Sequence, residues 1–282
     1  MREDFFARMV RSMRSGVRIV VPAAAVALAL AGCQSNITQR QAPTPAQLYG
    51  GAVQPVSGPV LLRYRPVGPV QLSGTVQASA DVSSYHFDKR DALSGNGRIE
   101  ASGEGLIALS VTFSVGAHEL TEELDVQPFT LDLLMTDLGE IKDADFSFAS
   151  ADRLTDSERT EIIETIISLF PIFQWPETAI QPGEPFTAVN FAVTRGNTVM
   201  RETGDLALRI DGETTYDGRR AYLIGFSGRA QGTSGDNAIS GYYVIDAQSG
   251  LMLERRFTGR DKDYFQQHIV YRDYDVESHI RF

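Results

Sequence analysis

The stretch Val70-Gln-Leu-Ser-Gly-Thr-Val-Gln-Ala-Ser-Ala80 decides the fold class, because small or apolar residues alternate with polar ones along its whole length. Successive side chains of a β-strand point to opposite faces, so a period of two predicts a strand with one apolar and one wet face. The same alternation returns in residues 107–115 and 129–136, and again after residue 185. About eleven strands are expected, and their short connections make them antiparallel.

Pairs of turn-forming residues mark where these strands should reverse. Gly, Asn and Asp accept the positive φ angles of tight hairpin turns more readily than other residues do. We therefore predict hairpin turns at five places, which are Asn96-Gly97, Asp211-Gly212, Asp217-Gly218, residues 232–236 and residues 246–250.

One segment has a helical period instead. Residues 155–158, Thr-Asp-Ser-Glu, form a capping box, and Pro171 ends the segment. Between them, six apolar residues fall on one side of a helix, opposite Glu164. They are Ile162, Ile163, Ile166, Ile167, Leu169 and Phe170. The prolines between residues 171 and 185, with Trp175 among them, then predict an extended crossing that is not a central strand.

These elements predict a mainly β fold, in which a large curved antiparallel sheet forms a half-barrel or open barrel. The amphipathic helix should pack on or in its concave face, because so wide an apolar stripe must be buried on a sheet. Two interpretations of the stripe stay open: it completes the core, or part of the interior holds a ligand. In the second, the possible pocket lining is Ile162, Ile163, Ile166, Ile167 and Phe170.

The amino terminus carries a secretory signal. Five arginines precede an apolar stretch, residues 19–30, which ends in Leu30-Ala-Gly-Cys33. This tetrad resembles the lipobox of bacterial lipoproteins, which implies cleavage before Cys33 and acylation of that cysteine. Gln34 stands where an Asp retains such proteins in the inner membrane, so the resemblance implies an outer-membrane lipoprotein that faces the periplasm.

Three regions follow from this signal. Residues 1–32 are the predicted signal peptide, and residues 33–58 are a predicted flexible tether that begins at the lipidated Cys33. In the tether, Gln, Pro, Ser, Thr and Gly predominate and Arg40 is the only charged residue. Residues 59–282 form the predicted single β-rich periplasmic domain.

The order of strands, one helix and more strands resembles the half-barrels of the lipoprotein carriers LolA and LolB and of LppX-like lipoproteins. In those proteins, helices cover the concave face of a curved sheet. Residues 180 to 260 are also similar to uncharacterised Gram-negative envelope proteins. The residues that carry this second similarity are Pro182-Gly183-Glu184, Asp217-Gly218, Ala221-Tyr222, Asp246 and Gly250-Leu251.

Composition excludes several classes of function. The 282 residues carry a formal net charge of −10, which disfavours nucleic acid as a partner, and the single cysteine excludes a disulfide framework and cysteine-based zinc sites. His86 with Asp88, and His268 with Asp273, are more typical of solvated surface histidines than of acid–base pairs. No catalytic motif occurs, so we expect a non-enzymatic protein with no cofactor and no metal.

Two hypotheses remain. The first is an outer-membrane-anchored lipoprotein that binds or carries a hydrophobic, lipid-like ligand. The second is a structural or assembly lipoprotein that docks on an envelope protein complex through a sheet edge or its acidic surface.

Overall fold

Long antiparallel strands dominate the computed structural model. It describes residues 44–82, 85–115, 128–148, 155, 166, 169–194, 198–202, 207–232, 235–265 and 268–282. The first strands are β1 (Gly68–Val82), β2 (Tyr85–Ala101), β3 (Ile107–Val115), β4 (Phe129–Met135) and β5 (Ile141–Phe148), and η1 (Gly103–Gly105) is a short turn of 3₁₀ helix. Short strands follow as β6 (Phe173–Gln174), β7 (Pro185–Phe186), β8 (Val189–Thr194) and β9 (Thr198–Glu202). The last strands are β10 (Ala207–Tyr216), β11 (Arg219–Gly232), β12 (Gly235–Asp246), β13 (Met252–Phe265) and β14 (His268–Arg281).

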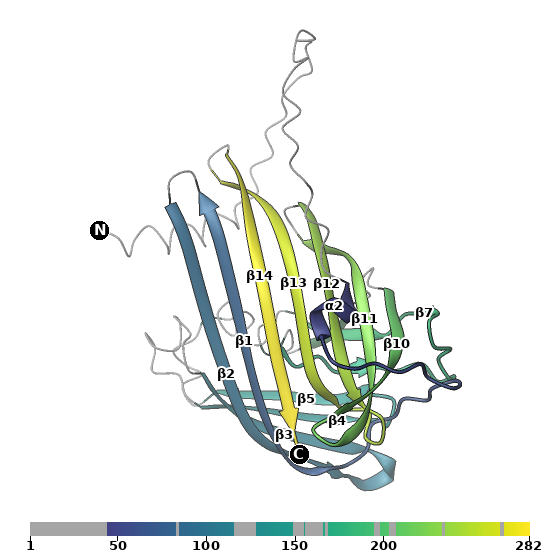
Figure 1. Ribbon diagram of the computed structural model, residues 1–282. Helices are drawn as coiled ribbons and strands as arrows, with labels where there is room; N and C mark the ends of the chain where they lie inside the picture. Colours follow the sequence, from purple (N-terminus) through teal and green to yellow (C-terminus); the bar gives the residue numbers. More distant parts are fainter. Residues whose placement is uncertain are drawn as a thin grey trace, which may run out of the picture. The chain divides into compact units, whose positions relative to one another are not determined.

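Eleven of the described strands form one open sheet in the order β5-β4-β3-β2-β1-β14-β13-β12-β11-β10-β7. The first strand pairs with the last, which joins the two halves of the chain, and β5 and β7 remain as unpaired edges. Figure 1 shows β3, β4 and β5 running crosswise to β12, β13 and β14, so the sheet is strongly curved but not closed. The prediction of a curved antiparallel sheet is confirmed.

The two faces of the sheet bury different sets of residues. Along β11, Tyr222 and Ile224 belong to a large hydrophobic cluster, whereas Ala221 and Leu223 belong to a small one on the opposite face. The large cluster includes residues from both ends of the sheet, so the sheet bends around it. We call this concave side the inner face and the other side the outer face.

The predicted helix reaches the inner face at the residues that the structure describes. Ile166 and Leu169 are helical, the Phe170 amide donates to the Ile166 carbonyl at 2.8 Å, and Pro171 is no longer helical. Both helical residues are 1% exposed and belong to the large cluster. The helix end is therefore where the sequence predicts it, while Ile162, Ile163 and Ile167 lie outside the described residues.

A second helix, α2 (Pro45–Tyr49), packs against the outer face at β11, β12 and β13. Thr44 and Gln47 form a complete capping box, and the Tyr49 hydroxyl lies 2.9 Å from Thr214 Oγ1. Further along, Gln54 and Glu213 exchange backbone hydrogen bonds. The predicted tether is therefore wrong at its carboxyl end, because residues 44–58 contain this helix and are held on the sheet. Among the described residues, no helix has the length and apolar character needed to cross a bilayer.

The predicted turns divide into two groups. Residues 217–218 and 246–250 reverse the chain as expected, and β11 and β12 end and begin on either side of residues 233–234. Asn96-Gly97 instead lies inside β2, and Asp211-Gly212 forms a bulge in β10, so these two predictions are wrong. The proline-rich crossing is confirmed, since Pro185 lies in the edge strand β7 and β6 pairs only in a small sheet with β8 and β9.

Candidate functional site

The helix end rests on two small residues that lie side by side on the inner face. Gly74 of β1 pairs with Ser278 of β14, and a Cβ at Gly74 would lie only 3.1 Å from the Leu169 side chain. The Ser278 hydroxyl donates to the Leu169 carbonyl at 2.6 Å. The last turn of a helix leaves carbonyl oxygens without partners, so this hydrogen bond both caps the helix and fixes it to the sheet.

Arg255 is the next residue across the inner face, beside Ser278 on β13. Its guanidinium carbon is 4.4 Å from the centre of the Phe257 ring and 5.5 Å from that of Tyr243. The residue is 8% exposed, and its Nε and Nη1 atoms have no hydrogen-bond partner. Loss of water around the buried cation lowers the pKa of Arg255, although the Tyr243 side chain opposes that shift.

A neighbouring row on the inner face is apolar throughout. It runs from β1 to β10 through Val76, Val276, Phe257, Gly241, Phe226 and Leu208. Val76 and Phe257 are only partly buried, whereas Phe226 stacks on Tyr243 with ring centres 4.7 Å apart. This row lies two residues along the strands from Arg255, or about 7 Å.

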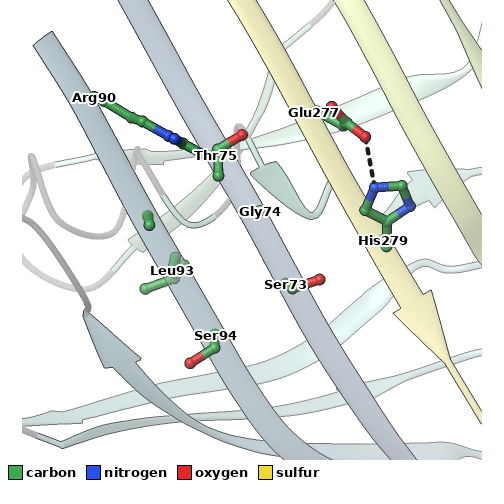
Figure 2. Close-up of a pocket in the computed structure, with 9 residues that line it drawn as sticks. Ser73, Gly74, Thr75, Arg90, Leu93, Ser94, Glu277 and His279 are labelled. Carbon is green, nitrogen blue, oxygen red and sulfur yellow. Dashed lines mark hydrogen bonds and ion pairs between the residues drawn. The ribbon is translucent and has the colours of Figure 1, made fainter.

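The outer face carries a polar hollow of about 420 Å³ across β2, β1 and β14 (Figure 2). Small side chains form the base of the hollow, and longer charged or ionisable ones stand at its sides. The small residues are Ser73, Thr75, Ala92 and Ser94, and the longer ones are Arg90, Glu277 and His279. Strand pairing places Ser73 opposite both Ser94 and His279.

His279 is the centre of a hydrogen-bonded cluster at the rim of this hollow. Its Nε2 lies 2.9 Å from Glu277 Oε1, its Nδ1 lies 3.1 Å from the Tyr216 hydroxyl, and Glu254 accepts a hydrogen bond from Tyr242 nearby. Burial and the negative charge of Glu254 raise the pKa of Tyr216, which stays protonated as a hydrogen-bonding group at neutral pH. The cluster can hold a polar group, and no set of His, Cys, Asp and Glu among the described residues could hold a metal ion.

The residues proposed from sequence have different outcomes. Cys33 lies outside the described residues, as do three of the five proposed lining residues, Ile162, Ile163 and Ile167. Ile166 and Phe170 are buried in the large cluster, where Phe170 packs 5.9 Å from the ring of Phe113. Lining of a ligand pocket by these residues stays a prediction.

The two His–Asp pairs named in the sequence analysis lie in long strands. Residues 86 and 88 belong to β2, and residues 268 and 273 belong to β14. Register places Asp88 and Asp273 opposite the same residue, Ser79, which puts them on one face of the sheet. The side chains of His86 and His268 are not among those the structure describes.

Sequence reasoning missed Arg255 and His279. Counting back in twos from the apolar Phe257 would place Arg255 on the inner face, but it would place Leu253 there too. A bulge opposite Val244 and Ile245 shifts the register, and Leu253 packs in the cluster of the outer face. The signal for His279 is weaker, because its partner Tyr216 comes from the end of a strand that is distant in sequence.

Comparisons with known proteins add little. No protein-family model matches the sequence, and no curated protein matches it. Among solved structures, the ywiB protein from Bacillus subtilis aligns with a TM-score of 0.18 and 6% identity, over 77% of this chain and 96% of its own. A DUF1329 family protein from Desulfovibrio piger aligns with a TM-score of 0.23 and 8% identity, over 77% of this chain and 86% of its own. Similarity at this level implies no shared function.

Proposed function

We propose that this protein is a non-enzymatic, lipid-anchored protein of the bacterial cell envelope that binds a hydrophobic, lipid-like molecule on the inner face of its sheet. The observation that carries the proposal is the apolar row from Val76 to Leu208, which remains only partly buried at Val76 and Phe257. An open sheet with an aliphatic and aromatic concave surface offers a chain of methylene groups about 0.8 kcal/mol for each group buried.

In this proposal the helix end bounds the binding surface and the sheet contacts the ligand. Leu169 and Phe170 close one end of the apolar surface, since Leu169 lies over Gly74 and is capped by Ser278. The ligand then lies along the strands beyond that contact, against Val76, Val276 and Phe257. The protein needs no catalytic side chain for this function, because it only binds the ligand.

Mass spectrometry tests the binding directly. The full chain with Cys33→Ala, which keeps residues 44–58 on the sheet, is purified, and its native and denatured masses are compared. We expect an additional mass of lipid size that is lost on denaturation. A ligand-free native spectrum, together with no uptake of a fluorescent fatty acid, would instead favour the assembly role.

Two tryptophan variants locate the ligand. Val76→Trp fills the inner face beside the helix end, whereas Gln77→Trp places the same side chain on the opposite, exposed face of β1. We expect Val76→Trp to reduce the bound lipid by at least about tenfold and Gln77→Trp to leave it unchanged. Equal loss in both variants, or in neither, would place the ligand elsewhere.

The membrane anchor is a separate part of the proposal. It rests on the lipobox residues Leu30-Ala-Gly-Cys33, which end an apolar stretch and contain the single cysteine. We expect the full chain to incorporate a labelled fatty acid and Cys33→Ala to incorporate none. Equal labelling of both proteins, or label in neither, would contradict the anchor.

A further inference from the structure

We propose that Arg255 binds the anionic head group of the ligand, so that the protein selects a single-chain amphiphile with a carboxylate, such as a long-chain fatty acid. This inference rests on the proposed function, since it names the class of ligand that the inner face takes.

The first argument is the surroundings of Arg255. Two aromatic rings lie beside its guanidinium, the small Ser278 lies on the next strand, and two of its nitrogen atoms have no hydrogen-bond partner. Buried arginines normally have a carboxylate or several carbonyl oxygens as partners, because a charge moved out of water is costly unless it is paired. An anion from the ligand would supply that partner.

The neighbouring arginine shows the usual arrangement. Arg256 follows directly in β13 and points to the opposite face, where its guanidinium lies 3.3 Å from Asp275. Arg255 takes part in none of the other ion pairs in the described part of the chain. Although Arg256 Nε also has no hydrogen-bond partner, Arg256 has a carboxylate beside it, whereas the only polar side chain of the described residues that acts on the Arg255 guanidinium is that of Tyr243.

The second argument is the distance between Arg255 and the apolar row. Phe257 belongs to both surroundings, because its ring contacts the guanidinium and its backbone lies in the row with Val276 and Val76. A carboxylate at Arg255 would therefore start its alkyl chain at Phe257 and extend it along apolar side chains. In a fatty acid the carboxylate is bonded directly to the alkyl chain, which matches the direct succession of Arg255 and the apolar residues.

The third argument is the size of the charge. One guanidinium with two free donor nitrogens matches a monoanion, and charge-assisted hydrogen bonds of this kind are the strong ones. In the low dielectric of the interior, the neutral analogue of the same chain length gains none of this electrostatic contribution.

The experiment compares three probes on the full chain with Cys33→Ala after removal of bound lipid. Hexadecanoate carries the anion and the chain, 1-hexadecanol carries the chain alone, and acetate carries the anion alone. We expect hexadecanoate to bind at least about tenfold more tightly than hexadecanol, and acetate to bind far more weakly than either, since a charged hydrogen bond is added to the same buried chain.

Arg255→Met and Arg256→Met are the matched variants. Met fills a similar volume without a charge, so Arg255→Met should remove the preference for hexadecanoate, to within about twofold, and leave hexadecanol binding unchanged. Arg256→Met should keep the preference. Without ligand, Arg255→Met should melt no lower than the parent protein, because it removes an unpaired charge from the interior.

Each alternative result has its own meaning. Equal affinity for hexadecanoate and hexadecanol in the parent protein would overturn the role of Arg255 while leaving the proposed function in place, and this comparison needs no variant. Weakening of both probes by Arg255→Met, with a lower melting temperature, would make Arg255 a structural residue. Acetate binding as tight as hexadecanoate binding would indicate a free small anion. Binding of none of the probes would overturn the proposed function as well.

Discussion

Ile166→Glu is expected to lower the free energy of unfolding by about 4–5 kcal/mol, because it removes a buried side chain and leaves a carboxylate in an apolar core. Ile166 is 1% exposed and belongs to the large cluster of the inner face. Its carbonyl also accepts the last helical hydrogen bond, from Phe170. Urea unfolding followed by the fluorescence of Trp175, the single tryptophan, measures the loss.

Leu61→Glu is the control for this substitution. It introduces the same carboxylate at a large apolar residue that is 54% exposed, so we expect a change within about 0.5 kcal/mol. Small and equal losses in the two variants would mean that the helix end contributes little to the core. A large loss in Ile166→Glu alone would establish that the helix is part of the folded unit.

The strands and the helix end could be predicted because each depends on a local period. The alternation of residues 70–80 becomes β1, in which Val70, Leu72 and Gly74 are buried between exposed residues. The burial of Ile166, Leu169 and Phe170 follows the helical spacing in the same way. Such periods record which face meets the core and need no knowledge of distant partners.

The turns predicted at Gly97 and Gly212 are wrong because the role of each glycine depends on segments distant in sequence. A Cβ at Gly97 would overlap the backbone of Ser110 on the neighbouring strand, and one at Gly212 would overlap Val53 of the amino-terminal segment. Both glycines therefore allow close approach of another chain segment and do not form the predicted turns. A glycine in a strand has either meaning, and sequence alone does not separate them.

Residues 44–47 contain a helix-start signal, although the composition of residues 33–58 predicts a flexible tether. Thr44-Pro-Ala-Gln47 has the spacing of a capping box with a proline at the first helical position, and α2 begins there. The contacts that hold it, such as Tyr49 with Thr214, join residues that are 165 positions apart. The surroundings of Arg255 likewise depend on distant segments, because Tyr243 lies on β12 and Ser278 lies on β14.

Alkaline unfolding is the second large effect that we expect, and the two fully buried tyrosines, Tyr64 and Tyr243, are among the groups that cause it. Burial raises the pKa of Tyr64 and of Tyr243 above the usual value near 10. Tyr64 also accepts a hydrogen bond from the Phe173 amide at 3.0 Å, and the Tyr243 ring packs against Phe173. Both side chains are therefore neutral in the folded protein at a pH where they ionise in the unfolded chain.

The sign of the effect follows from these shifts. Their contribution to stability is fully present below pH 10 and is lost as the pH rises above 10, because only the unfolded state releases the two protons. Each of the two groups changes the free energy of unfolding by about 1.4 kcal/mol per pH unit, so together they contribute about 2.8 kcal/mol per pH unit. Tyr216 and Tyr242, whose pKa values burial also raises, make the slope steeper still. Urea melts between pH 8 and pH 11.5, with absorbance at 295 nm to follow tyrosinate, measure the slope.

Tyr64→Phe separates ionisation from packing in this experiment. At pH 8 the variant should lose about 1–3 kcal/mol, because the Phe173 amide loses its buried acceptor. Above pH 10 its stability should fall less steeply than that of the parent protein, by about 1.4 kcal/mol per pH unit, since one tyrosine fewer ionises only on unfolding. The two stability curves should therefore converge as the pH rises. Parallel curves, or a parent protein as stable at pH 11.5 as at pH 8, would show that these hydroxyls are not confined to the core.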